Sequence, residues 1–170
     1  STNSNTRTIT MGSGTWELTA TSASTVWNMA TVTNLTLNQN TSTIKISGST
    51  ASIRTFAGGG ETYYNLWFTN ATTAGALTIT GANTFNDIRI DAVDATAQTI
   101  TFPNSTTTVT TWSVSGSATK LITLVRTGGS GTFTLTKSGG GQTSSDYLSI
   151  SNSTATPTET WCAGANSTDG

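Results

Sequence analysis

The chain has 170 residues and a formal net charge of −1, and only 9% of its residues are charged, against about 25% in an average globular domain. Nucleic-acid binding needs clustered lysine and arginine to neutralise phosphates, and seven basic residues spread along the chain exclude that partner. The absence of histidine excludes Ser-His-Asp and Cys-His catalysis and histidine-based zinc sites. The single cysteine, Cys162, excludes an intrachain disulfide and a thiolate metal cage.

Threonine is the commonest residue, and its β-branched side chain favours strands. The low net charge argues against disorder, so the chain is expected to fold as an all-β protein. No run of about 18 apolar residues is present, and no membrane insertion is expected. No phosphate-binding glycine motif occurs, and no cofactor is expected. A serine at position 1 suggests a processed chain or a fragment of a longer one.

In chain order, the apolar residues come as short triplets in which the first and third positions are mostly apolar, the period-2 signature of a half-buried strand. Turn-forming Gly, Asn and Ser residues separate the triplets. The triplets lie at 9–11, 16–18, 35–37, 44–46, 53–55, 66–68, 77–79, 88–90, 100–102, 112–114, 122–124, 133–135 and 148–150.

Every third triplet recurs at a shared period of about 34 residues, within the 20–50 residues typical of solenoids. Leu35, Leu66, Ile100 and Phe133, for example, begin one such series. Three interleaved series predict a three-sided parallel β-solenoid with one strand per side and about 34 residues per coil. The residues expected in its common core are Leu77, Ile88, Ile100, Ile122 and Phe133. A β-sandwich, which also has regularly spaced strands, is the alternative.

Residues 12–170 are predicted to form a single solenoid domain, with glycine clusters at 58–60, 128–131 and 139–141 as its corners. Residues 1–11 are interpreted as a lead-in or as a strand that pairs with another subunit. The ends of a solenoid expose unpaired strand edges. The expected partner is therefore the protein itself, in a homo-oligomer or a head-to-tail filament.

The middle residue of each triplet is expected to point outward. On this basis Glu17, Arg54 and Arg89 stack in successive coils, either as a salt ladder or with the two arginines receiving an acidic sugar. Trp67 is expected to face outward, where it could stack on a sugar or pack against another subunit. The alternative is a shifted register with Trp67 inward.

Two further tryptophans, Trp16 and Trp112, are the first residues of their triplets, a position expected to point inward, and they are predicted to lie in the core. The weak binding candidates are therefore Trp67, Arg54 and Arg89, with surface glycans as the expected ligand.

Asp87, Asp91 and Asp94 form the only dense acidic group. Glycoside hydrolysis needs two suitably spaced carboxylates, but these residues are interpreted as turn residues, so no catalytic site and no metal site is predicted. Asn-x-Ser/Thr sequons are possible glycosylation sites if the host modifies surface proteins. They occur at Asn34, Asn40, Asn70, Asn104, Asn152 and Asn166.

Several segments resemble the Thr/Gly-rich β-solenoid repeat modules of phage tail-fibre and adhesin-like surface proteins. They are residues 14–19, 25–28, 54–60, 64–66, 81–85, 145–150 and 161–169. The resemblance implies a fibre-like or adhesin-like part of a virion or cell surface without established catalysis. Family members usually continue into a glycine-rich stretch ending in tryptophan, so the terminal cap is expected to be missing.

The favoured function is thus a structural or adhesive module, not an enzyme, at an extracellular or virion surface. One alternative is a polysaccharide-cleaving, tailspike-like solenoid. The other is an ice-binding solenoid, because the pairs Thr99/Thr101 and Thr132/Thr134 suggest a flat threonine array. Trp67 and the charged positions Lys45, Arg54 and Arg89 are expected to interrupt such an array.

Overall fold

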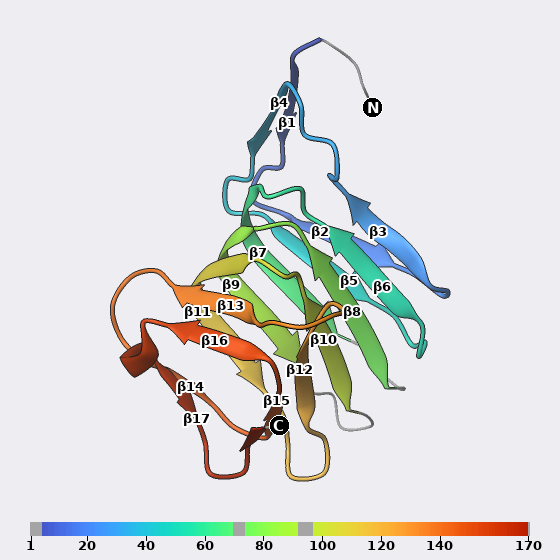
Figure 1. Ribbon diagram of the computed structural model, residues 1–170. Coiled ribbons are helices and arrows are strands. Elements are labelled where there is room, and N and C mark those ends of the chain that lie inside the picture. The colour runs from blue at the N-terminus through green and yellow to red at the C-terminus, as the bar shows by residue number, and fades with distance from the viewer. Residues whose placement is uncertain (1–4, 70–73, 92–96, 170) are drawn as a thin grey trace.

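The computed structural model describes residues 5–69, 74–91 and 97–169. The chain winds as a parallel β-solenoid, with its two termini at opposite ends of the stack (Figure 1). The described residues contain no α-helix, and the single 3₁₀ turn is η1 (Thr158–Thr160). The prediction of a parallel β-solenoid is confirmed, and the alternative of a β-sandwich is wrong.

Each coil near either end of the solenoid contains three strands, one for each side. At the N-terminal end these are β1 (Arg7–Thr10), β2 (Thr15–Thr19) and β3 (Ser24–Asn28), then β4 (Leu35–Asn38), β5 (Thr43–Ser47) and β6 (Ile53–Ala57). At the C-terminal end they are β13 (Phe133–Lys137), β14 (Thr143–Ser145) and β15 (Leu148–Ile150), then β16 (Ser153–Thr156), β17 (Trp161–Ala163) and β18 (Thr168–Asp169). The middle coils alternate long and shorter strands: β7 (Thr62–Thr69), β8 (Gly75–Thr80), β9 (Thr84–Asp91), β10 (Gln98–Phe102), β11 (Thr106–Ser115) and β12 (Ile122–Arg126).

The long strands β7, β9 and β11 turn a corner of the solenoid without an intervening loop. Their pairing skips one residue in each strand, at Tyr64, Asn86 and Thr110. Before this point β11 pairs with β13, and after it Trp112 donates a hydrogen bond to Ser145 of β14. The half of each long strand that precedes the corner therefore belongs to the first side, together with β13 and β16. The half that follows the corner belongs to the second side, together with β2 and β5. The third side is the sheet β18-β15-β12-β10-β8-β6-β3.

The predicted coil length is wrong. Leu66 pairs with Ile44 and Ile88, and Ile88 pairs with Trp112, so the register advances by 22, 22 and 24 residues. The solenoid has about six turns of roughly 24 residues. A middle coil contributes only two apolar triplets because β7, β9 and β11 each cover two sides. Taking every third triplet therefore grouped residues from different sides.

The predicted core is confirmed at every residue named for it. Leu77, Ile88, Ile100, Ile122 and Phe133 are all buried in one continuous cluster. Full burial of such a side chain contributes about 1.5–3 kcal/mol, so the cluster is the main source of stability. Aromatic pairs run through it: the Phe102 and Phe133 rings are stacked, the Phe56 and Tyr63 rings meet edge to face, and the ring centroids are 4.9 Å apart in both pairs.

The three glycine clusters lie at turns between strands, as predicted. The corner at Gly58 shows why one of them requires glycine. The fully buried carboxamide of Asn83 accepts a hydrogen bond from the Gly60 N–H at 2.9 Å and donates one to the Thr80 carbonyl at 3.0 Å. A Cβ atom on Gly58 would overlap this carboxamide, so the buried position of the Asn83 side chain requires glycine at residue 58.

The N-terminal segment belongs to the first coil. Strand β1 pairs in parallel with β4 of the same chain, and Met11 is buried in the core. Pairing of this segment with another subunit could use only the opposite edge of β1, and that role stays a prediction. Trp112 is in the core as expected, whereas Trp16 is 42% exposed. Trp16 lies in the terminal strand β2, where its ring packs edge-on against Trp27 at 6.4 Å.

Candidate functional site

A polar ladder runs along the outer face of the second side. Neighbouring strands place Glu17 beside Lys45, Lys45 beside Trp67, Trp67 beside Arg89 and Arg89 beside Ser113. Parallel strands lie about 4.8 Å apart, so side chains in the same register position stack directly. The Glu17 carboxylate forms a salt bridge with Lys45 at 3.0 Å, and a hydrogen bond from Ser47 together with this ion pair lowers the pKa of Glu17.

Trp67 points outward, as predicted, and the alternative of an inward Trp67 is wrong. The Lys45 ammonium and the Arg89 guanidinium lie 4.8 Å and 4.5 Å from the centre of its ring. Because β5 and β9 flank β7 on opposite sides, each cation covers a different face of the indole. The indole N–H donates to Asp91 at 2.7 Å, and Asp91 also pairs with Arg89 at 2.8 Å. Stacking of a sugar on this ring would first have to displace one cation.

Arg54 is not part of this ladder, and its predicted outward position is wrong. Its side chain is fully buried, whereas the preceding Ile53 is 53% exposed. Phe56 is fully buried, and it places the residues at even positions of β6 inward. The prediction instead took the apolar Ile53 as an inward residue, which placed Arg54 outward. Lys45 is the residue that stands beside Glu17, and the steps of 22–28 residues between paired strands would have identified it.

The acidic residues of the candidate hydrolytic site lie on the same outer face. Asp87 accepts a hydrogen bond from Ser113 at 3.0 Å. Burial raises the pKa of its carboxyl group and outweighs this hydrogen bond and the charge of Arg89, which both lower it. Asp91 is held by Trp67 and Arg89. Asp94 lies outside the described residues. The described part of the chain contains no group of three or more His, Cys, Asp or Glu side chains placed to hold a metal ion, and Cys162 is an exposed free thiol.

The first side carries the largest threonine array, of which the sequence predicted only the pair Thr132 and Thr134. One column of register partners consists of Thr62, Thr84, Thr108, Thr136 and Thr156. A second, parallel column consists of Thr106, Thr134 and Thr154. Their hydroxyl groups bond to one another at the C-terminal end, where the Oγ1 atoms of Thr136 and Thr156 are 2.7 Å apart. The signal in the sequence was the Thr-x-Thr pattern of β11, β13 and β16.

The third side also presents hydroxyl groups. Thr25, Thr55, Thr78 and Thr101 form one outward column. A second column consists of Ile53, Ala76, Thr99, Thr123, Ser149 and Thr168. No charged residue lies in these two columns. The charges expected to interrupt a threonine array lie elsewhere, since Lys45 and Arg89 are on the second side and Arg54 points inward.

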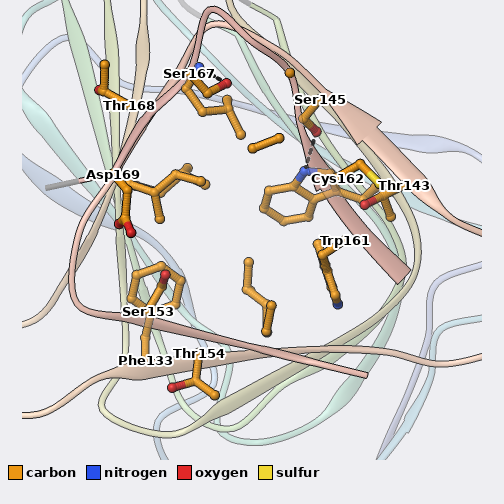
Figure 2. Close-up of a pocket in the computed structure, with 18 residues that line it drawn as sticks. Phe133, Thr143, Ser145, Ser153, Thr154, Trp161, Cys162, Ser167, Thr168 and Asp169 are labelled. Atoms are coloured by element: carbon orange, nitrogen blue, oxygen red, sulfur yellow. Dashed lines mark hydrogen bonds between the residues drawn. The ribbon is translucent and has the colours of Figure 1, made fainter. Parts of the chain in front are cut away.

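A cavity of about 370 Å³ opens at the C-terminal end of the core (Figure 2). Its apolar lining includes Trp112, Phe133 and Leu148, which belong to the main core cluster. The Trp112 indole already donates to Ser145 at 3.0 Å, the bond drawn as a dashed line in Figure 2. The cavity is therefore the open end of the solenoid interior, bordered by β16, β17 and β18.

The sequons for which the structure gives a position are all exposed: Asn34, Asn40, Asn104, Asn152 and Asn166. Asn70 lies outside the described residues. The Asn166 side-chain amide donates to Asp146 at 2.7 Å, and a glycan on this nitrogen would leave it one N–H for that bond. The glycosylation of these residues stays a prediction.

The chain matches no known protein family, no curated protein and no solved structure. Among residues 5–69, 74–91 and 97–169, no helix is long and apolar enough to cross a membrane. The fold and the geometry of its faces are therefore the basis for assigning a function.

Proposed function

We propose that this chain is a rigid structural and adhesive module of a fibre at an extracellular or virion surface. The proposal rests on one observation, which is that the strands at both ends of the solenoid have a free edge. Strands β1, β2 and β3 each have one hydrogen-bonded neighbour, and so do β16, β17 and β18. Each end thus presents three edge strands with the same chain order and the same direction.

Such edges accept another strand through main-chain hydrogen bonds. A further coil would continue the core across the junction and cover the open cavity at the C-terminal end. The added coil can come from the same polypeptide or from a second copy, and a second copy would give a head-to-tail filament, because heterologous contacts propagate without closing. Adhesion would use the hydroxyl-rich first and third sides, with surface glycans as the expected partner.

A proline on the free edge of β1 tests self-assembly. The N–H groups of Arg7 and Met11 donate to the carbonyls of Asn34 and Asn38, so the intervening Thr8 N–H points to the free edge by the period-2 geometry of a strand. We expect Thr8→Pro to keep the circular dichroism spectrum and melting temperature of the wild-type protein but to shorten or abolish filaments in electron micrographs. Thr8→Ala, which keeps the N–H, is the matched control. Equal assembly by both variants and the wild type would refute pairing through this edge.

Binding to ordered ice is a second candidate function, favoured by the absence of charge from the two outward columns of the third side. Regular threonine hydroxyl and methyl groups on a flat sheet can order a layer of water. We expect a measurable freezing hysteresis that Thr101→Lys abolishes, whereas Ser113→Lys on the second side leaves it intact. A wild-type protein without hysteresis eliminates this function and leaves the structural proposal unaffected.

A further inference from the structure

The C-terminal end of the solenoid is hollow because its last inward residues are small. Phe133 and Leu135 of β13 pair with Ser153 and Ala155 of β16, so two large side chains of one coil are followed by small ones in the next. On the second side the last inward position is Ala163, which pairs with Ser145. The cavity of about 370 Å³ is lined by all of these residues. A neighbour that fills it must therefore bring large apolar side chains.

The N-terminal end has the opposite shape. The inward residues of its first coil include Ile9, Trp16 and Leu18, which pair with inward residues of the second coil. Ile9 and Leu18 are only partly buried, and Trp16 is 42% exposed, because β1 and β2 have no strand on their other edge. Large apolar side chains are thus uncovered at one end of the molecule and absent from the other.

The cavity also carries a negative charge. Asp169 pairs with Ile150, and the same inward column continues to Leu124, so the Asp169 side chain has the inward parity of the core. It is the only charged side chain among the described residues that line the cavity, and neither salt bridge of the described residues includes it. The cavity is therefore complementary to a partner that presents a cation beside apolar groups.

The N-terminal end presents such a cation. Arg7 pairs with Leu35 and has the same inward parity as Ile9. Its guanidinium group has one hydrogen-bond partner among the described residues, the Thr33 carbonyl at 2.8 Å, and takes part in neither of their salt bridges.

The register of the first side places this cation beside the carboxylate. Arg7 begins β1, and Ser153 begins β16. When β1 of a second copy is aligned beside β16 with both pairs of inward residues matched, Arg7 lies over Ser153 and Ile9 over Ala155. Ser153 and Asp169 border the same cavity, as Figure 2 shows. The guanidinium of the second copy therefore enters next to Asp169.

The charges also select the orientation of the two copies. Two C-terminal ends placed against each other would bring two Asp169 carboxylates together and would supply no large side chains to fill the cavities. Two N-terminal ends would bring two Arg7 side chains together. A head-to-tail contact joins opposite charges and places the large residues of one end on the small residues of the other.

We propose that the occupant of the C-terminal cavity is the first coil of a second copy of this chain, with Ile9, Trp16 and Leu18 covering the cavity and Arg7 paired with Asp169. This inference rests on the proposed fibre function and names the partner for its free edges. The pair of charges makes the contact directional, because it is satisfied only when the copies are stacked head to tail.

Reversal of each charge tests the contact, with assembly followed by sedimentation velocity over a range of protein concentrations. We expect Arg7→Asp and Asp169→Arg each to raise the concentration required for assembly about tenfold or more, because like charges then face each other at every junction. An equal mixture of the two variants should assemble like the wild type, because alternating copies place opposite charges at every junction. Lys120→Asp, which makes the same change of charge in a turn between β11 and β12, is the control and should assemble normally.

Restored assembly in the mixture supports the contact, and its absence overturns it. Should Arg7→Asp fail to fold, Arg7→Gln takes its place, since loss of one charge also removes the repulsion in the mixture. Single variants that assemble like the wild type would overturn this contact and leave self-assembly itself intact. A wild-type protein that stays monomeric at every concentration would also overturn it, whereas a fibre built from coils of one polypeptide would be unaffected.

Discussion

At the scale of single residues, the direction of one side chain depends on its neighbours in the adjacent coils. Trp67 sits between two cations on the outside, and Arg54 sits under an aromatic ring on the inside. Both are middle residues of a triplet. They differ because Leu66 and Phe68 set the inward parity of β7, whereas Phe56 sets that of β6. A single exposed isoleucine, Ile53, is enough to give the wrong parity from sequence.

The raised pKa of Asp87 gives a prediction for stability against pH. Because burial raises the pKa in the folded state, the folded protein holds this proton more tightly than the unfolded chain. The resulting contribution is favourable at low pH and is lost as pH rises through the folded pKa. Asp87→Asn removes the ionisation and keeps an oxygen that can accept from Ser113.

We therefore expect Asp87→Asn to unfold at a higher urea concentration than the wild type near about pH 6 and to show little difference near about pH 3. Urea titrations across this range measure the difference directly. Asp91→Asn serves as the comparison, and it should destabilise the protein near neutral pH because Asp91 accepts from both Trp67 and Arg89. A constant difference for Asp87→Asn at every pH would contradict the assignment.

At the scale of elements, the sequence was sufficient for the strands but not for their grouping. Period-2 triplets located the inward residues of β8, β9, β10, β12 and β13 because each alternates between the core and solvent. The first side of the middle coils was missed, since it carries a single buried apolar residue per strand, Tyr63, Phe85 or Val109, in place of a triplet. Without that side the predicted coil was too long. The same error produced the predicted ladder of Glu17, Arg54 and Arg89, whose members do not all lie on one side.

Strand β10 offers a matched test of inward and outward positions. Ile100 is fully buried, and its neighbour Thr101 faces out between Thr78 and Val125. We expect Ile100→Asp to unfold the chain, because an unpaired buried charge costs several kcal/mol against a typical total stability of about 5–15 kcal/mol. Thr101→Asp should cost less than about 1 kcal/mol.

Circular dichroism and thermal melting distinguish the two variants of β10. Wild-type melting of Ile100→Asp would refute the assigned register. Equal loss of structure in both variants would show that β10 does not tolerate any charge, and the inward and outward faces would then have to be reassigned.

At the scale of the whole molecule, each coil is supported only by its neighbours along the axis. Stability of such arrays is close to a sum of coil and interface contributions. The end strands β1, β2 and β3 have one neighbour each, as do β16, β17 and β18. The middle strands β8, β9 and β10 have two neighbours and enclose fully buried residues such as Phe85 and Ile100.

Hydrogen exchange should follow this gradient along the axis. We expect the amides of β8, β9 and β10 to exchange slowest and those of β1 and β18 to exchange fastest, because local opening begins where the fewest contacts must be broken. In the presence of assembled filaments, the terminal strands should gain protection while the middle strands change little. Uniform exchange over all strands would instead indicate a single cooperative unit.

The continuous corner in β7, β9 and β11 restricts how the protein can vary in evolution. One residue inserted before Asn65 would reverse the parity of everything after it in β7, so that Leu66 and Phe68 would face solvent and Trp67 the core. The corners closed by turns, such as the one at residues 128–131 between β12 and β13, can change length without reversing any strand. Homologues should therefore differ in length at those turns and keep a constant residue count along the long strands.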